Sequence, residues 1–555
     1  MGFNLIQEAW IRARRQSGAK EIIAPWQVTA DMADPLVSLA SPRPDFNGAL
    51  IQFLIGLLQT AAAPEDQDAW WEWFDNPPTP DRLREKFSAV ANAFELDGEG
   101  PRFMQDLELR DSETKPISGL LIDAPGGNTL KNNQDHFVKR DTVSQLCPVC
   151  TATALFALQT NAPSGGVGHR VSLRGGGPLT TLVMGESLWQ TIWLNVLPQD
   201  EFLSSSGNSK RQNPVDIFPW LGPTRTSEAT SHHKLTTPDD AHPTQMFWGM
   251  PRRIRLDFGQ TTTGSCDVCG AQGDSLLTQY QTKNYGVSYE GWQHVLTPHT
   301  RDKTGLPMPR HAQPGGVNYR HWLGLVQAIK DDKASREPAR VVDTFIQERR
   351  RDSGLDYRLW AFGYDMDNMK ARCWYEATMP LILVEDHYKE EFEYDIRSMV
   401  MAANEVAGNL KQCMKNALYG RVKEISKKRV PLWEVSPNAK TDGTLFNSVS
   451  TMFWQRTEPA FLDVLRKLKT TLERGEGTES ARRDWHAELC KKARMLFDET
   501  VDGGVLEDGN PQSVVVARAE LNRFNYGKNI VTDLLRLPAK EKNETNIPET
   551  GEMNA

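Results

Sequence analysis

The sequence predicts an α+β fold, in which a large mixed α/β domain carries a structural zinc site and is followed by a four-helix bundle. Three observations predict it. Two C-x-x-C pairs lie far apart in the chain, short apolar runs alternate with Gly- and Pro-rich turns up to about residue 385, and helical periodicity dominates beyond that point. We therefore expect domains at 1–388 and 389–538, and a polar, disordered tail at 539–555.

The N-terminal part begins with short strand-like pieces, which a helix follows. Its apolar residues recur at the i, i+3, i+4, i+7 and i+8 positions that form one buried helix face. They are Leu50, Phe53, Leu54, Leu57 and Leu58. Further along, Arg253–Phe258 alternates with period two, as a half-buried strand does, and Met379–Val384 is typical of a buried strand.

The C-terminal part contains four segments with helical periodicity. They are 391–426, 445–473, 478–500 and 511–536. The third segment places its apolar residues on one helix face, and these are Trp485, Leu489, Ala493, Leu496 and Phe497. Glycines at 475, 477, 503 and 504 mark short connections between helices, which favour a four-helix bundle.

Composition restricts the partners of the protein. The formal net charge is −8, whereas a protein that binds phosphate over its whole surface is normally basic, so any contact with nucleic acid must be local. Seven cysteines without a dense framework are typical of a reducing cytoplasm. The most apolar run, Ala49–Leu58, is too short to span a bilayer, which takes about 20 residues, and the N-terminus has no signal-peptide pattern. We expect a cytoplasmic protein with no membrane partner.

The most specific motif is the pair of cysteine knuckles, Cys147-Pro-Val-Cys150 and Cys266-Asp-Val-Cys269. A C-x-x-C turn brings two thiolates to one tetrahedral zinc, at about 2.3 Å per Zn–S bond, and two such turns complete a closed structural site. Two redox C-x-x-C motifs, or four unrelated buried cysteines, are the alternative interpretations. The paired spacing favours one shared zinc.

No catalytic constellation is evident in the sequence. It contains no P-loop, no H-E-x-x-H and no G-x-G-x-x-G followed by an acidic residue, and Ser187 lacks the second glycine of a nucleophile elbow. His232 and His233 lie in a polar loop, where exposed histidines are more common than metal ligands. The sequence therefore predicts a protein that is not an enzyme. A stand-alone zinc-dependent nucleic-acid enzyme that uses His232, His233 and His242 remains the alternative.

Two further stretches have the chemistry of nucleic-acid contacts. The glycine-rich Pro163–Gly168 can bring backbone amides close to phosphates or into a groove, although a plain flexible turn also explains it. A second run, Leu173–Pro178, is more typical of a structural turn. His136–Arg140 places an aromatic beside two cations, which suits a single strand but also an ordinary strand edge. In the helical part, basic residues from Lys411 to Arg429 either form a solvated face or bind phosphate.

Several stretches, in this order, resemble the CasA family, the large subunits of the type I-E CRISPR surveillance complex called Cascade. The stretches are Trp10–Ile11, Pro101–Asp106, Leu146–Phe156, Ser172–Gly176, Pro178–Thr181 and Phe247–Arg252, together with the helical C-terminus. The resemblance covers nearly the whole chain.

This resemblance implies a non-catalytic subunit that recognises the short PAM beside the target, promotes strand separation and R-loop formation, and recruits a helicase-nuclease in antiviral defence. Its implied partners are the other Cascade subunits, the guide crRNA, the target double-stranded DNA and that helicase-nuclease. In such complexes base pairing recognises the long target, and protein recognises only a short duplex element.

Position by position, the resemblance implies roles for particular residues. The zinc ligands are Cys147, Cys150, Cys266 and Cys269. The glycine loop that approaches the PAM from the minor groove is Ser164, Gly165, Gly166, Val167 and Gly168. The loop that meets the guide handle and the start of the target is Phe137, Val138, Lys139 and Arg140. The lysine finger falls at Lys283 or Asn284. The strand-separating wedge falls at Asp367 and Asn368.

Three positions depart from the family pattern. Val167 stands where a glycine is usual, and the finger position aligns to Asn284 unless the register shifts to Lys283. The wedge carries Asn368 beside the acidic Asp367 instead of a longer glutamine. These departures leave the PAM preference open, and a purely structural scaffold, in which the glycine loop is only a turn, is a further alternative.

Overall fold

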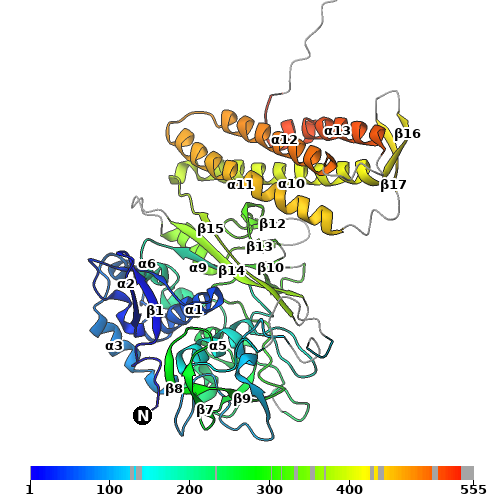
Figure 1. Cartoon of the computed structure of the whole chain (residues 1–555). Helices are drawn as coiled ribbons and strands as arrows, with labels where there is room; N and C mark the ends of the chain where they lie inside the picture. Colours follow the sequence, from blue (N-terminus) through cyan, green and yellow to red (C-terminus); the bar gives the residue numbers. More distant parts are fainter. Residues whose placement is uncertain are drawn as a thin grey trace, which may run out of the picture. The chain divides into compact units, whose positions relative to one another are not determined.

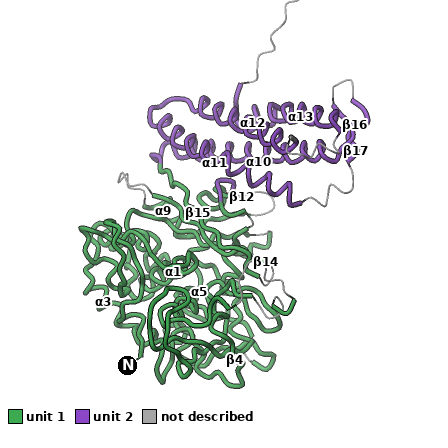
Figure 2. The backbone as a smooth tube through the Cα atoms, viewed as in Figure 1, with its two compact units in different colours: residues 1–317, 321–383 green, residues 318–320, 384–555 purple. Residues whose placement is uncertain are grey.

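The chain folds into two compact units (Figure 2), which consist of Met1–Val317 with His321–Leu383 and of Asn318–Arg320 with Val384–Ala555. The computed structural model describes residues 2–125, 130–132, 141–231, 234–301, 303–313, 315–330, 335–349, 357–367, 370–425, 430–435, 443–502 and 510–538. The first unit ends at Leu383, and three residues from the middle of the chain, Asn318–Arg320, join the second unit. None of the described helices is long and apolar enough to cross a membrane.

The first unit begins with a three-stranded sheet and a central helix (Figure 1). The strands are β1 (Ile11–Arg15), β2 (Lys20–Ile23) and β3 (Leu36–Leu39), in the order β2-β1-β3. Helix α1 (Pro44–Ala61) follows, as the leucine and phenylalanine spacing predicted. Its burial differs from the prediction, because every residue from Ala49 to Leu58 is buried and not one face alone. The reason is that α1 contacts other elements on several sides, including α5, α6, β14 and the 3-10 turn Pro243–Phe247.

Tryptophans fill much of this core. Trp70 lies on α2 (Gln67–Asp75), and its indole nitrogen donates to the carbonyl oxygen of Val196 at 3.0 Å. Trp193, on α6 (Leu188–Trp193), donates in return to the carbonyl oxygen of Trp70 at 2.9 Å. The polar indole atoms are thus satisfied inside an apolar cluster. Further α-helices in the described part of this unit are α3 (Pro80–Ser88), α5 (Pro148–Asn161), α7 (Gln199–Leu203), α8 (Pro214–Ile217) and α9 (Arg340–Glu348).

Four further sheets complete the described part of the first unit. One has the order β4-β9-β6, with β4 (Glu113–Pro116), β9 (Gln279–Lys283) and β6 (Arg253–Leu256). A hairpin pairs β7 (Thr261–Ser265) with β8 (Gln272–Leu277). The third has the order β15-β14-β5, with β15 (Lys370–Pro380), β14 (Arg358–Asp367) and β5 (Thr180–Met184). The fourth has the order β11-β10-β13-β12, with β11 (Pro307–Pro309), β10 (His299–Arg301), β13 (Ser335–Glu337) and β12 (Ile329–Lys330).

One predicted strand has different bounds in the structure. Met379 lies near the end of β15, which stops at Pro380, so most of the predicted strand Met379–Val384 lies outside any strand. Proline has no backbone N–H to donate, which is why a strand commonly ends there. The predicted strand at Arg253–Phe258 is present as β6, shortened to Leu256.

The described part of the second unit contains four α-helices and a β-hairpin (Figure 1). The helices are α10 (Lys389–Tyr419), α11 (Gly443–Glu473), α12 (Glu479–Asp502) and α13 (Pro511–Asn525). Helix α10 contacts the other three, and α12 contacts α11 and α13. The strands β16 (Gly420–Ile425) and β17 (Pro431–Val435) were not predicted, because the helical pattern continued to residue 426. A π-helical turn (Asn529–Leu534) follows α13.

The apolar face predicted for the third helix is buried, with Trp485, Leu489, Ala493, Leu496 and Phe497 each at most 1% exposed. Tyr319 reaches the same core. It stacks on Phe461 with ring centroids 4.4 Å apart, and its hydroxyl lies 2.7 Å from the hydroxyl of Thr457. This explains why Asn318–Arg320 belong to the second unit.

Candidate metal centre and nucleic-acid interface

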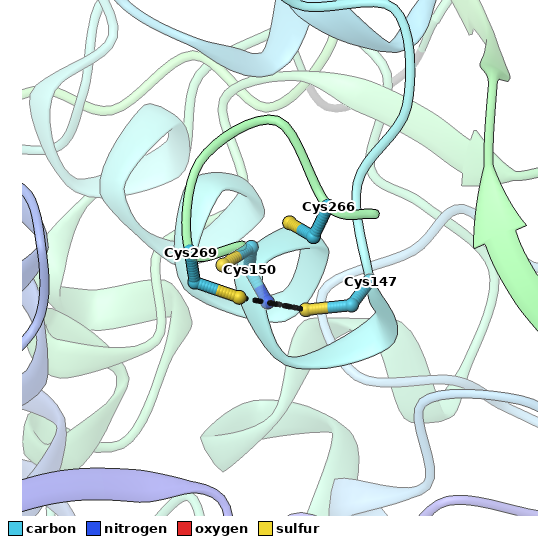
Figure 3. Close-up of side chains that lie close together, drawn as sticks. All are labelled: Cys147, Cys150, Cys266 and Cys269. Carbon is cyan, nitrogen blue, oxygen red and sulfur yellow. Dashed lines mark hydrogen bonds between the residues drawn. The ribbon is translucent and has the colours of Figure 1, made fainter. Parts of the chain in front are cut away.

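The four cysteines of the two knuckles converge in the structure (Figure 3). Their sulfur atoms all lie within 4.8 Å of one another, and the Sγ atoms of Cys147 and Cys269 are 3.7 Å apart. Four sulfurs at about 2.3 Å from one tetrahedral zinc would be separated by about 3.8 Å. All four thiols are free, so no disulfide competes for them. The arrangement therefore fits a single zinc ion.

The first knuckle is the beginning of helix α5. Cys147 is the N-cap residue, Pro148 is the first helical residue, and the backbone N–H of Cys150 points to the Cys147 sulfur at 3.5 Å. Proline suits this position because its missing N–H would have no helical partner there. The positive end of the helix dipole also favours negatively charged sulfur at these two residues.

The second knuckle is the turn between β7 and β8. The N–H of Cys266 donates to the carbonyl oxygen of Ala271 at 2.9 Å. The N–H of Gly270 donates to the carbonyl oxygen of Cys266 at 2.8 Å. Gly270 has φ of +73°, a left-handed conformation that favours glycine. A hairpin turn of this kind presents Cys266 and Cys269 on the same side.

Hydrogen bonds join the two knuckles independently of a metal. The carboxylate of Asp267 accepts from the N–H groups of Ser144 and Gln145 at 2.7 and 2.9 Å. Leu146 and Leu277 exchange two backbone hydrogen bonds of 2.9 and 2.8 Å. Asp267, which lies inside the second C-x-x-C motif, therefore orders the residues just before the first.

The electrostatics of the cluster favour a cation. The thiols share their hydrogen bonds, which raise the pKa of Cys150 and lower the pKa of Cys266, so the cluster holds negative charge unevenly when no metal is bound. Four thiolates this close repel one another without a positive charge between them. A zinc ion held by Cys147, Cys150, Cys266 and Cys269 would supply that charge, and four protein ligands would leave no open position for catalysis.

The glycine loop meets the predicted finger region directly. The side-chain amide of Asn284 donates to the carbonyl oxygen of Val167 at 2.8 Å. The N–H of Tyr285 donates to the carbonyl oxygen of Gly168, also at 2.8 Å. Gly168 has φ of +79°, and a Cβ there would lie 2.9 Å from the Cβ of Asn284. Lys283 is the last residue of β9, which pairs with β4 and β6, so the proposed finger position lies at the end of a sheet strand.

The residues of the loop differ in what surrounds them. A Cβ on Gly165 would lie 2.4 Å from that of His169, so the fold itself requires glycine there. A Cβ on Gly166 would have no described atom within 4 Å. Val167 is 79% exposed, which is unusual for a large apolar side chain. Gly166 and Val167 are therefore the part of the loop that is open to an approaching ligand.

The second glycine run connects the base of the loop with β14. A Cβ on Gly176 would lie 3.2 Å from the Cα of Pro163, and one on Gly177 would lie 2.5 Å from the carbonyl oxygen of Tyr364. Close backbone approach on both sides explains glycine at these two positions. Leu173–Pro178 is thus a turn packed between the start of the glycine loop and the strand that leads to Asp367.

The predicted wedge lies at the end of β14. Asp367 is the last residue of that strand, and Arg372 on β15 lies 3.9 Å from its carboxylate and 2.7 Å from that of Asp365. The hydrogen bond to Asp365 raises the pKa of Arg372 above its usual value. The second wedge residue, Asn368, lies outside the described residues, as do Phe137, Val138, Lys139 and Arg140.

Basic residues near the loop were not identified from the sequence. Partial desolvation of the ring and the charges of Arg252 and Lys115 lower the pKa of His169, which places these cations close to the loop. Arg170 lies 5.8 Å from the ring of Tyr285 and donates to the hydroxyl of Ser227 at 2.7 Å. Of these basic residues, only His169 and Arg170 directly follow the loop in the sequence. That adjacency is the one signal that could have indicated these two residues.

The histidines of the alternative enzyme are not brought together among the described residues. His242 begins the 3-10 turn Pro243–Phe247, and its Nδ1 lies 2.7 Å from the hydroxyl of Thr244. His232 and His233 lie outside the described part of the chain. The four-cysteine cluster contains no histidine.

Comparison with known proteins identifies the family. The family model described as CRISPR-associated protein Cse1 matches residues 4–496. The chain belongs to the Cse1 family. The name CasA is used for the same proteins, as in a structure of Thermus thermophilus CasA (Cse1).

Solved Cse1 structures have the same fold as this Cse1 chain. Thermobifida fusca Cse1 matches with a TM-score of 0.70 at 16% identity, over 97% of this chain and 99% of that one. A crystal structure of Thermus thermophilus CasA matches with a TM-score of 0.69 at 18% identity, over 95% and 99%. A chain of a structure described as a CRISPR RNA-guided surveillance complex matches with a TM-score of 0.63 at 16% identity, over 94% and 99%.

Proposed function

We propose that this Cse1 chain is the non-catalytic large subunit of a Cascade surveillance complex and that it recognises the PAM of target DNA. Membership of the Cse1 family and the likeness to a chain of a CRISPR RNA-guided surveillance complex support the first part. One observation carries the second part. The loop Ser164–Gly168 is hydrogen-bonded to the segment after Lys283, so two of the segments proposed to contact DNA form one surface.

The chemistry of this surface suits the edge of a duplex. Gly166 and Val167 offer a thin, exposed stretch of backbone with a single apolar side chain, which fits a narrow minor groove. The minor groove distinguishes A·T from G·C pairs but little else, so we expect several PAM sequences to be accepted. Lys283 and the nearby Lys115 and Arg170 would then neutralise phosphates beside the groove.

The zinc site supports the loop mechanically. Helix α5, which Cys147 caps, runs from Pro148 to Asn161 and leads directly into Pro163–Gly168. A zinc ion that joins the first turn of α5 to the β7–β8 hairpin would hold both the helix and the strands that precede β9 and Lys283. We therefore propose a structural zinc whose role is to keep the two sides of the DNA-contacting surface in place.

Further steps would need other parts of the chain and other molecules. We propose that Asp367, the last residue of β14, and the adjoining Asn368 enter the duplex next to the PAM and separate the first base pair. Phe137–Arg140 would contact the guide crRNA and the start of the target. The other Cascade subunits would supply most of the phosphate neutralisation, which is consistent with a net charge of −8 here, and the bound complex would recruit the helicase-nuclease.

The decisive experiment measures target binding by the guide-loaded complex, with and without this subunit, on duplexes with a randomised PAM. We expect PAM-selective binding with the subunit and its loss without it. Selective binding that persists without the subunit would overturn the proposal and leave the chain as a scaffold. Metal-dependent nucleic-acid cleavage by the isolated protein would instead support the zinc-dependent enzyme.

A further inference from the structure

Arg174 is a buried cation whose hydrogen-bond partners are all neutral. The residue is 3% exposed, and one terminal nitrogen donates to the hydroxyls of Thr180 and Thr297, both at 3.0 Å. The other terminal nitrogen donates to the side-chain oxygen of Gln52. Buried charges in proteins are normally paired with an opposite charge, because an unpaired one costs several kcal/mol.

The charged groups around Arg174 provide no compensation. Burial lowers the pKa of Arg174 to about 9, so the guanidinium stays positively charged at neutral pH, and no described carboxylate contributes to that shift. Together with burial, the charge of Arg174 lowers the pKa of two titratable neighbours, His294 and His299, and both of these are buried bases. This part of the interior therefore has a positive charge without a counter-charge from the described residues.

A cavity lies beside this charge. Its volume is about 20 Å³, and its polar lining includes Arg174, Ser172, Gln159 and His294, whereas Phe156 and Phe247 contribute an apolar wall. A site that holds one water needs about 10–15 Å³ on the same scale, so this cavity has room for one particle somewhat larger than water. It is too small for sulfate or for a nucleotide phosphate.

His294 adds a hydrogen-bond donor to the lining. The N–H of Leu296 donates to its Nδ1 at 3.1 Å, so in the neutral ring the proton lies on Nε2. Burial and the charge of Arg174 lower the pKa of His294 well below its ordinary value, which keeps the ring neutral. The cavity is thus lined by a guanidinium and by a ring that carries a second N–H donor.

We propose that this cavity binds one small monovalent anion, of the size and charge of chloride, as the counter-ion of Arg174. The site would require an anion because donors and positive charge line it, and its volume selects a monatomic ion. Ser172–Arg174 joins the glycine loop to the turn Gly175–Gly177, so the anion would fix the segment between them. This assignment does not depend on the proposed function.

Bromide provides the direct test, since it replaces chloride and is located by its anomalous scattering. Crystals of the full chain grown or soaked in sodium bromide should show an anomalous peak in the cavity, within hydrogen-bonding reach of Arg174. A cavity that contains only an ordered water, with no bromide peak, would overturn the proposal.

Thermal unfolding of the full chain tests the energetic role. At constant ionic strength, replacing gluconate by chloride should raise Tm saturably, by about 2 °C or more. Arg174→Met keeps most of the side-chain volume and should remove the chloride dependence. The control is Arg349→Met, because Arg349 is equally buried, yet donates to the carbonyl oxygens of Leu194 and Val196 at 2.9 and 3.1 Å and does not line this cavity.

The control variant should keep the chloride dependence whatever its own stability. Equal Tm values in chloride and gluconate for the parent protein, or an unchanged chloride dependence in Arg174→Met, would each overturn the proposal. If Arg174→Met does not fold, the bromide experiment on the parent protein decides alone.

Discussion

The side-chain amide of Asn284 donates a 2.8 Å hydrogen bond to the backbone carbonyl of Val167. This bond connects the end of β9 to the most exposed part of the glycine loop, two segments far apart in the sequence. A second bond, from the N–H of Tyr285 to the carbonyl oxygen of Gly168, aligns the same two segments. Their relative position is therefore set by the fold of the first unit, and the experiments below test what that position does.

Gly166→Trp tests the loop as the DNA-contacting element. Space is open around Gly166, so we expect the variant to fold and to assemble with its partners. Its side chain would fill the approach to the groove, and target affinity should fall about tenfold or more, a loss of at least ~1.4 kcal/mol. Binding to a PAM-containing duplex by the assembled complex is the measurement. The matched control is Gly100→Trp, at another open glycine away from the loop, and equal affinity of the two variants would contradict the loop assignment.

Asn284→Ala tests the contact between loop and finger. Removing one partly exposed hydrogen bond should weaken the free energy that holds the loop in its ordered conformation by about 0.5–1.5 kcal/mol. Target affinity should therefore fall about two- to tenfold. The global Tm should change little, because Asn284 is exposed. Asn284→Asp is the informative companion, since a carboxylate cannot donate to the Val167 carbonyl and also adds a negative charge near DNA. An affinity ranking of parent, Ala and then Asp is expected, and an Asp variant as strong as the parent would exclude the contact.

Cys147→Ser and Cys269→Ser test the metal centre. Metal analysis of the parent should find close to one zinc per chain, and each variant should lose zinc and unfold at a lower temperature. Cys373→Ser is the control, because Cys373 is exposed and outside the cluster, and it should keep both zinc and Tm. Full zinc content in a variant that carries both Cys147→Ser and Cys269→Ser would show that the knuckles are not the ligands.

Tyr319→Ala and Tyr319→Phe test the core of the second unit. Tyr319 is fully buried among Phe461, Trp454 and Trp485, so the alanine variant should lose about 3–5 kcal/mol of stability. The phenylalanine variant keeps the ring stack and loses only the hydroxyl contact to Thr457, at about 1 kcal/mol. Hydrogen exchange of α11 and α12 amides is the measurement. Equal protection in both variants would mean that the ring contributes little.

Local patterns account for the elements that the sequence predicted well. The spacing of Leu50 to Leu58 predicted α1, and that of Trp485 to Phe497 predicted the core face of α12, because helix periodicity depends on near neighbours alone. The same reasoning missed β16, since the periodic signal of α10 continues smoothly into residues that pair with β17. It also missed burial around all sides of α1, which depends on how many other elements pack there.

Both cysteine knuckles, the helical C-terminal part and the family could be recognised from the order of the residues alone, because a C-x-x-C turn and an amphipathic helix are properties of near neighbours. The paired spacing also predicted that the two knuckles meet, whereas most other contacts between distant segments became evident only from the folded chain. The contact of Asn284 with Val167, the hydrogen bond from the N–H of Ser144 to the carboxylate of Asp267 and the burial of Arg174 beside a cavity all depend on residues that are distant in the chain. Such contacts arise from the packing of the whole first unit, and no local pattern of residues encodes them.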